Sequence, residues 1–282
     1  MNHLTLPYDR CLASTVKDRL RLGHCDIDPD SLVITQNPEY LGSGVWGDVY
    51  KIHDRDGVPY ALKLIHSAKR MEITPDFRER IANRLLQGAW EHRDILTGHE
   101  AFTNLYGVSF HKVEKCSLAE FAEGQNVRKA IEEGVDYSKT PEKAGRMLMQ
   151  VAKAIKYLHA RDYLIFDVGW YNTIEHKGNV RFCDNDAIEP KGDNPKSGDI
   201  EGFAHMIDEI FNGGKIAKLE KYNRYAAVSQ EHGREYPWTR RQQLPSELSL
   251  IVPEILHKKR NDTLTIDTFI YAIARDFGLQ AR

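Results

Sequence analysis

The segment IFDVGWYNTIEHKGNVRFCDND, which runs from Ile165 to Asp186, holds the residues with the clearest chemical pattern. Asp167 and Asn172 stand five positions apart, and Asp184 follows after a short hairpin-like stretch. Carboxylate and carboxamide oxygens ligate hard cations such as Mg²⁺, and a further carboxylate can accept the proton of an attacking hydroxyl. The three side chains can therefore supply one base and two metal ligands around a single phosphate.

A glycine-rich turn and a lysine upstream fit the same chemistry. The string LGSGVWGDVYKI places Gly42, Gly44 and Gly47 in the pattern G-x-G-x-x-G-x-V, which ends at Val49. Glycines let a backbone approach phosphates closely, but dinucleotide-binding folds use the same glycines with a helix directly after them. A strand-like run follows in this chain instead, and Lys63, in YALKLI, lies on the next such run. Together these residues indicate phosphoryl transfer from ATP.

Two glutamates compete to be the carboxylate that holds the side chain of Lys63. Glu91 is the prediction, because its distance to the next strand suits a helix that ends near the cleft. Glu79, which is closer to Lys63 in the sequence, is the alternative. The glutamate that does not pair is expected to be a solvated helix charge.

Two other aspartates imitate the base and are rejected on their spacing. The run His92-Arg93-Asp94 precedes the strands that lead into the second half of the chain, and a histidine stands five positions after its aspartate. Arg161-Asp162 has its asparagine ten positions away. Asp167 follows a predicted helix that ends at His159, has Asn172 at the required spacing and leads into a strand. Asp167 is therefore the predicted base.

The periodicity of apolar residues predicts the elements that position these side chains. Alternation indicates strands in the first third of the chain and just after Asp167, over Tyr40-Leu41, Val49–Ile52, Tyr60–Leu64, Asn104–Phe110, Ser117–Phe121 and the two runs joined at Lys177-Gly178-Asn179. Helical spacing predicts helices near Ala13–Leu22, from Pro75 to Leu96, over Pro141–His159 and throughout the region after Asp199. The strand-rich and helix-rich parts meet near Glu123-Gly124, which predicts an α+β arrangement with a cleft at the junction.

The composition limits the class of protein. The chain has 282 residues, 41% of them hydrophobic and 28% charged, which is typical of a globular protein. A formal net charge of −2 argues against a nucleic-acid partner held by bulk positive charge. Neither an apolar run long enough to span a membrane nor a signal-peptide pattern is expected, and four scattered cysteines favour reduced thiols and a cytoplasmic location.

The ordered set of motifs resembles the protein kinase family over about residues 38–275. In this resemblance Asp167 matches the catalytic aspartate, Asn172 the metal-binding asparagine and Asp184 the aspartate that opens the D-F-G signature. The glycine turn would cover the phosphates, and Lys63 would lie in the third strand. Asp199 with Phe203 resembles the helix that anchors the catalytic loop.

The resemblance implies a bilobal protein-kinase-like fold with a strand-rich N-lobe (38–121) and a helical C-lobe (125–275). Residues 1–37 would form an N-terminal extension and residues 276–282 a short tail. The segment from Glu120 to Gly124 would be the hinge, with Ala119 in the gatekeeper position.

The same resemblance implies ATP and Mg²⁺, or Mn²⁺, as cofactors. Asp167 and Lys63 would be the catalytic residues, and Asn172 and Asp184 the metal ligands. Residues of the strand-rich part and the hinge would hold the nucleotide: Leu41, Gly42, Gly44, Gly47, Val49, Ala61, Lys63, Glu91, Glu120 and Ala122.

Several positions depart from the family pattern. Ile165-Phe166 replaces the His-Arg before the catalytic aspartate, Asp184-Asn185-Asp186 replaces D-F-G, and Gly169 stands where serine/threonine kinases carry a lysine. The segment between Asp184 and Asp199 is short, and Ser197 is its only hydroxyl side chain. We therefore expect no switch by phosphorylation of an activation loop, and a reduced platform for peptide substrates.

The sequence thus predicts an ATP-dependent phosphotransferase, most simply a divergent serine/threonine-type protein kinase with a shortened activation segment. A protein acceptor is favoured over a small molecule. Two alternatives stay open, a small-molecule or glycan kinase of the same fold and a nucleotide-binding pseudokinase scaffold.

Overall fold

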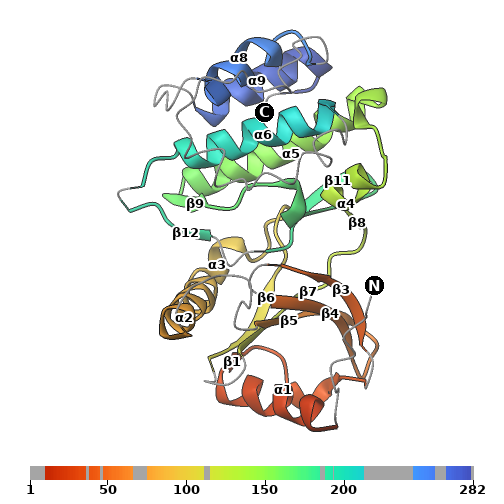
Figure 1. Ribbon diagram of the computed structural model, residues 1–282, viewed down its shortest axis with the longest axis vertical. Helices are drawn as coiled ribbons and strands as arrows, with labels where there is room; N and C mark the ends of the chain where they lie inside the picture. Colours follow the sequence, from red (N-terminus) through yellow and green to blue (C-terminus); the bar gives the residue numbers. More distant parts are fainter. Residues whose placement is uncertain are drawn as a thin grey trace. The chain divides into compact units, whose positions relative to one another are not determined.

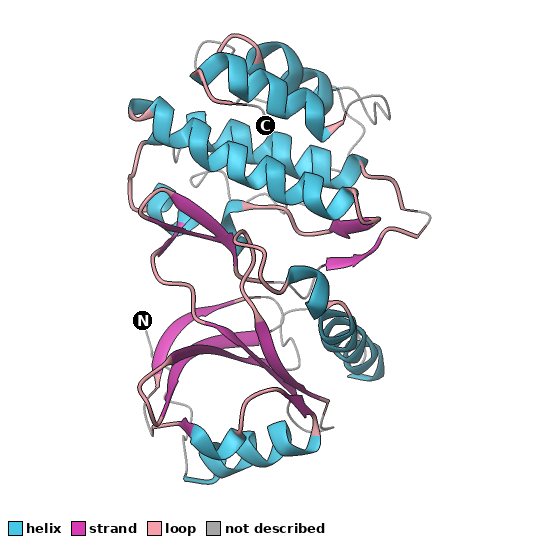
Figure 2. Ribbon diagram, turned by 180° about the vertical axis from the view of Figure 1, so that it is seen from behind, coloured by secondary structure: helices cyan, strands magenta, loops and turns pink. Residues whose placement is uncertain are grey.

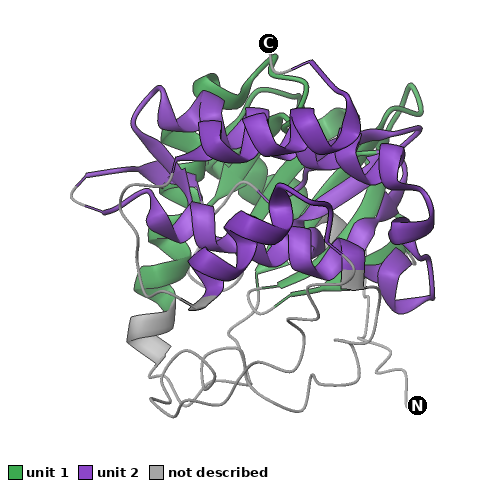
Figure 3. Cartoon of the chain, turned by 90° about the horizontal axis from the view of Figure 1, so that it is seen from above, with its two compact units in different colours: residues 1–122, 185–187 green, residues 123–184, 188–282 purple. Residues whose placement is uncertain are grey.

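The structure of the chain is a computed structural model that describes residues 10–35, 38–44, 47–65, 75–110, 115–184, 188–192, 194–212, 244–257 and 265–280. It divides into two compact units (Figure 3), the first made of residues 1–122 with 185–187 and the second of residues 123–184 with 188–282. Asn185 and Asp186, which replace the last two residues of the D-F-G signature, lie outside the described residues.

The first unit is built on a curled antiparallel sheet (Figure 1). Its strands run in the order β1-β6-β7-β5-β4-β2, and β3 also pairs with β4. They are β1 (His24–Cys25), β2 (Leu32–Val33), β3 (Glu39–Ser43), β4 (Gly47–Asp54), β5 (Pro59–Ile65), β6 (Leu105–Ser109) and β7 (Lys115–Glu120). Strands β3 to β7 confirm the five strands that alternation predicted in this part of the chain.

Alternate residues of this sheet face different helices. Helix α1 (Arg10–Leu22) lays Leu20 on the face that carries Leu62 of β5 and Leu118 of β7, and all three side chains are buried. Helix α2 (Pro75–Glu91), which is followed by α3 (Arg93–Leu96), packs Leu86 among residues that include Ile65. Burial of one such leucine contributes about 1.5–3 kcal/mol.

The N-terminal segment is part of this unit. A 3-10 turn (Pro29–Ser31) leads into β2, and β1 pairs with β6. The ring of Trp90, on α2, stacks on His24 at 5.3 Å between centroids and also receives the guanidinium of Arg93 at 3.8 Å. Gly23 comes so close to β6 that an added Cβ would lie 2.2 Å from the carbonyl oxygen of Val108. The segment expected to be an extension therefore contributes strands to the sheet and contacts to α2.

The second unit is mainly helical, with short strand pairs (Figure 2). Its helices are α4 (Val127–Glu132), α5 (Pro141–His159), α6 (Ser197–Asn212), α8 (Leu248–His257) and α9 (Ile266–Phe277), with 3-10 turns at Tyr137–Lys139 and at Trp170–Asn172 (η3). Its strands are β8 (Gln125–Asn126), β9 (Tyr163–Ile165), β10 (Thr173–His176), β11 (Asn179–Phe182) and β12 (Ile188–Pro190). β8 and β11 flank β10, and β12 pairs with β9.

Helix α5 has the bounds that the sequence predicts. Pro141 stands at its start, where the missing N–H of proline costs nothing, and its apolar stripe is fully buried. The stripe consists of Met147, Val151, Ile155 and Leu158. In the same unit the rings of Phe203 on α6 and Phe269 on α9 meet edge to face at 5.2 Å. No described helix is both long and apolar enough to cross a lipid bilayer.

Candidate active site

The predicted base and the predicted asparagine ligand are bonded to each other. The Nδ2 group of Asn172 donates to the backbone oxygen of Asp167 and to its Oδ2, each at 3.0 Å. The hydroxyl of Tyr171 donates to Oδ1 of the same carboxylate. Asp167 is exposed, whereas Asn172 is buried. The loop thus presents a carboxylate to solvent while its neighbours fix the orientation of that carboxylate.

Asp199, at the start of α6, anchors the strand that enters this loop. Its Oδ2 accepts a hydrogen bond from the backbone N–H of Ile165 at 2.9 Å and lies 2.8 Å from Nε2 of His159. Burial raises the pKa of the Asp199 carboxyl, and the bonds from His159 and Ile165 offset part of that effect. The predicted anchoring role of Asp199 is confirmed, and His159 is an additional partner that the sequence did not single out.

A hairpin brings Asp184 back beside the loop. β10 and β11 pair from Thr173 opposite Phe182 to His176 opposite Asn179. Lys177 and Gly178 form the turn, with φ of 52° and 85°, as a two-residue hairpin of this twist requires. Beyond the ladder the backbone N–H of Cys183 donates to the backbone oxygen of Asn172 at 2.9 Å. Asp184, the next residue, is therefore held close to Asn172 by the chain itself.

The turn η3, which ends at Asn172, is held by hydrogen bonds to other elements of the second unit. Trp170 is fully buried, and its Nε1 donates to the backbone oxygen of Met206 on α6 at 2.7 Å. Nδ2 of Asn126 donates to the backbone oxygen of Tyr171, also at 2.7 Å. These bonds hold the loop to α6 and β8.

In the first unit, the glycine turn joins β3 to β4. The backbone N–H of Gly44 donates to the oxygen of Gly47 at 2.8 Å, and Gly42 pairs with Val49 across the strands. A shift of register at Leu41 marks a bulge before the turn. An added Cβ on Gly47 would lie 2.4 Å from the oxygen of Leu64 on β5, so the close approach of these strands requires glycine there.

Lys63 lies on the sheet face that α2 covers. It is directly opposite Val49 on β4 and Ser117 on β7, and directly opposite residues share a face. Ala61 and Ile65 alternate with the buried Leu62 and so lie on this face as well. The structure therefore brings together the predicted residues Val49, Ala61 and Lys63, and the lysine is half-buried among them.

The two glutamates considered for Lys63 lie on different sides of α2. Ala82 and Leu86 face the sheet, and Glu79 shares their side because it precedes them by three and seven positions. Its Oε1 lies 3.6 Å from Nζ of Lys115, the residue opposite Ile65. Glu91 lies on another side of the helix and accepts a hydrogen bond from Gln87 at 2.6 Å. Both glutamates are exposed.

The segment expected to form the hinge follows the last strand of the first unit. Glu120 ends β7, and its Oε2 accepts hydrogen bonds from both the backbone N–H and Nδ2 of Asn104, at 3.2 and 2.9 Å. The ring of Phe121 receives Nζ of Lys51 at 4.3 Å. Ala122 is the last residue of the unit before the chain enters the second one.

A comparison with family models matches residues 35–189 to the protein kinase domain. The match covers more than half of the chain. The chain belongs to the protein kinase domain family. No curated protein matches it significantly.

Family membership confirms the predicted resemblance and the bilobal kinase-like fold, and it makes the chain a kinase-type phosphotransferase. Proteins with this domain transfer a phosphoryl group from ATP to a hydroxyl with the help of a divalent cation. In this kinase domain the decoy aspartates have no comparable setting. The side chains of Asp94 and Asp162 are 84% and 83% exposed, and the ion pair that each forms with a described residue is long, at 3.9 Å.

The donor set fits a divalent cation. Because Asn172 donates to Asp167 through Nδ2, its Oδ1 is the atom that can ligate a metal, and Asp184, which the hairpin returns to this part of the chain, offers a carboxylate. Among the described residues no group of three or more His, Cys, Asp or Glu side chains is placed to hold a metal ion, at this site or elsewhere.

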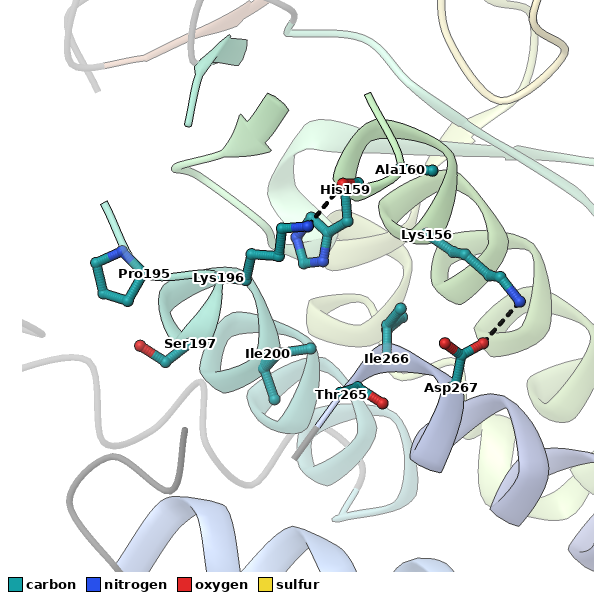
Figure 4. A pocket seen from close by; sticks show the side chains of 10 residues that line it. All are labelled: Lys156, His159, Ala160, Pro195, Lys196, Ser197, Ile200, Thr265, Ile266 and Asp267. Carbon is teal, nitrogen blue, oxygen red and sulfur yellow. Dashed lines mark hydrogen bonds and ion pairs between the residues drawn. The ribbon is translucent and has the colours of Figure 1, made fainter. Parts of the chain in front are cut away.

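A pocket of about 500 Å³ lies in the second unit, away from the loop residues predicted to act (Figure 4). Its two lysines are engaged, since Nζ of Lys196 donates to the backbone oxygen of His159 at 2.7 Å and Nζ of Lys156 lies 2.6 Å from Asp267. Its lining consists of Lys156, His159, Ala160, Pro195, Lys196, Ser197, Ile200, Thr265, Ile266 and Asp267. Of the lining residues, His159 is bonded to Asp199, which also accepts from the backbone N–H of Ile165 before the loop.

Proposed function

We propose that this kinase domain is an active ATP-dependent phosphotransferase in which Asp167 is the base. The observation that carries the proposal is the bonding of Asp167 to Asn172, in a loop that Asp199 anchors through Ile165. Asp167 accepts the proton of the acceptor hydroxyl, the acceptor oxygen forms a bond to the γ-phosphorus, and the bond from that phosphorus to the ADP oxygen breaks.

Residues of the first unit take the nucleotide in this proposal. The backbone around Gly42, Gly44 and Gly47 approaches the phosphates, and Lys63 neutralises their charge. Leu41, Val49 and Ala61 contact the adenine ring and the ribose of the nucleotide, and backbone groups at Glu120 and Ala122 bind the adenine. Asn172 and Asp184 would hold Mg²⁺ or Mn²⁺, which supplies further neutralisation of phosphate charge when bound.

Glu79 is the carboxylate that we now propose to hold Lys63, in place of Glu91. It lies on the same side of α2 as the residues that pack on the sheet, and Lys63 lies on the sheet face that α2 covers. Glu91, which is exposed as Glu79 is, lies on another side of α2 and is hydrogen-bonded to Gln87, one turn earlier on the same helix.

The acceptor that we propose is a serine or threonine hydroxyl of a protein. We also propose that phosphorylation of an activation loop does not switch this kinase on. Only a short stretch separates Asp184 from α6, and β12 ties part of it to β9 through the pairing of Ile188 with Ile165. Ser197, the hydroxyl residue of this stretch, is the first residue of α6. Mass spectrometry of active protein is expected to show full activity without phosphate on Ser197.

The central test is turnover of [γ-³²P]ATP with Mg²⁺ or Mn²⁺ and a panel of protein, sugar and small hydroxyl acceptors. We expect Asp167→Asn to lower kcat by about 10²–10⁴-fold, because general base catalysis contributes about that much. Asp184→Asn is expected to raise the metal concentration needed for half-maximal rate.

The chain supplies a matched control in Asp162→Asn. This substitution makes the same chemical change at an exposed aspartate with a φ of 57°, which asparagine tolerates. It should leave kcat unchanged. Equal background rates in wild type, Asp167→Asn and Asp184→Asn, together with nucleotide-dependent thermal stabilisation, would instead favour a pseudokinase scaffold.

A further inference from the structure

The side chain of Tyr171 is hydrogen-bonded to Asp167, the candidate base. Its hydroxyl donates to Oδ1 of Asp167, while Nδ2 of Asn172 donates to Oδ2 at 3.0 Å. The two donors approach different oxygens of one carboxylate. Since an ionised carboxylate can accept about four hydrogen bonds, both donors leave room for an acceptor hydroxyl.

The phenol ring of Tyr171 lies directly against Gly169, where no side chain stands in its way. An added Cβ on Gly169 would lie 2.3 Å from Cε1 and 2.7 Å from Cζ of the Tyr171 ring. The backbone of Gly169 is extended, with φ of −173° and ψ of 157°, so its conformation alone does not require glycine. The ring of Tyr171 therefore occupies the space that a side chain at position 169 would need.

The backbone of Tyr171 is held independently of its hydroxyl. Nδ2 of Asn126 donates to the backbone oxygen of Tyr171 at 2.7 Å, and the neighbouring Trp170 is fully buried and bonded to α6. The hydroxyl thus starts from a fixed backbone and reaches the carboxylate over the α-carbon of Gly169. A ring fixed in this way restricts the rotation of an otherwise exposed aspartate side chain.

We propose that Tyr171 is a positioning residue for Asp167, and that position 169 is glycine so that the phenol can reach the carboxylate. The inference rests on the proposed role of Asp167 as the base. In this proposal the neutral phenol of Tyr171 lies beside the base. While its ring is there, a charged side chain at position 169 cannot occupy the same space.

The first experiment measures steady-state kinetics of full-length Tyr171→Phe. The variant keeps the ring and loses the hydroxyl, so we expect kcat to fall about ten-fold or more, since a hydrogen bond to a charged group is worth about that factor. The KM for ATP should stay within about two-fold, and the melting temperature close to that of wild type, because the lost contact only orients Asp167. Tyr271→Phe, at a tyrosine 60% exposed on α9, is the matched control and should behave as wild type.

The second experiment is a double-mutant cycle between positions 169 and 171. Gly169→Ala should lower kcat because the new methyl group displaces the ring, whereas the same change in a Tyr171→Ala background should have little further effect. An equal penalty in both backgrounds overturns the steric coupling.

The outcomes separate this inference from the proposed function. If Asp167→Asn is inactive and Tyr171→Phe has the kcat of wild type, the positioning role is wrong and the function stands. If Asp167→Asn turns over as fast as wild type, there is no base for Tyr171 to position and both fail.

Discussion

Removal of the carboxylate of Asp199 tests whether α6 holds the loop that carries the candidate base. The side chain is 2% exposed, and its Oδ2 receives the backbone N–H of Ile165 at 2.9 Å and lies 2.8 Å from Nε2 of His159. Asp199→Ala removes the acceptor and leaves both groups buried without it. Asp199→Asn keeps an amide oxygen that can still accept from Ile165.

The expected cost follows from these contacts. Leaving a buried hydrogen-bonding group without its partner costs about 1–3 kcal/mol, so the loss of both bonds should cost about 2–6 kcal/mol. At about 2–4 °C for each kcal/mol in a chain of this size, the melting temperature of Asp199→Ala should fall by roughly 4–24 °C. Asp199→Asn should cost only about 1–2 kcal/mol, because one hydrogen bond is retained and the charge that burial disfavours is gone.

Thermal unfolding followed by circular dichroism measures both variants, with Asp94→Ala as a control at an exposed aspartate that should change stability by less than about 0.5 kcal/mol. Initial rates of phosphoryl transfer are measured on the same samples below the transition. If Asp199→Ala melts within about 2 °C of wild type and keeps its kcat, the buried carboxylate does not hold the loop.

Three further outcomes follow from other contacts. The pKa of Glu175 is subject to burial, which raises it, but hydrogen bonds from Lys143 and from the N–H of Gly178 lower it overall. The stability that Glu175 adds over Glu175→Gln is therefore present above its ordinary pKa and should vanish as the pH falls through the lowered value, as urea titrations between pH 7 and pH 3 will measure. Glu79→Gln should raise the KM for ATP or lower kcat by about ten-fold while Glu91→Gln behaves as wild type, and the reverse result would restore Glu91 as the partner of Lys63. Trp170→Phe should destabilise the chain by about 1–3 kcal/mol in chemical denaturation, because the backbone oxygen of Met206 loses the bond from Nε1 and the smaller ring leaves space at a fully buried position; an unchanged midpoint would contradict this.

The elements that the sequence predicted are those whose signals are local. Helix α5 has a proline at its start and one continuous apolar stripe, and both of its bounds were correct. The pairs formed by β1, β2, β8, β9 and β12 were not predicted, because strands of two or three residues have no periodicity of their own and exist only through their partners.

The residues of the candidate site also divide into those that local sequence signals predict and those that they do not. Asp167 and Asn172 lie within one loop, and a tight hairpin returns Asp184, so their spacing along the chain carries the geometry. The prediction of Glu91 rested on distance along the chain, whereas the proposal of Glu79 rests on helical phase, because Ala82 and Leu86 indicate which side of α2 meets the sheet.

Tyr171 gave no such signal. An aromatic residue beside a buried tryptophan is compatible with simple packing, and only the three-dimensional path of its ring over Gly169 shows that the hydroxyl reaches Asp167. The same holds for His159, whose bond to Asp199 joins residues forty positions apart.

The N-terminal elements α1, β1 and β2 limit how far this protein can be shortened. The family match begins at residue 35, after α1, β1 and β2, yet α1 covers Leu62 and Leu118 and β1 covers the edge of β6. A fragment that starts at residue 35 would expose an apolar sheet face together with an open strand edge, and such edges recruit strands from other chains. The smallest soluble piece of the first unit is therefore expected to include residues 10–34, and the shorter fragment is expected to aggregate.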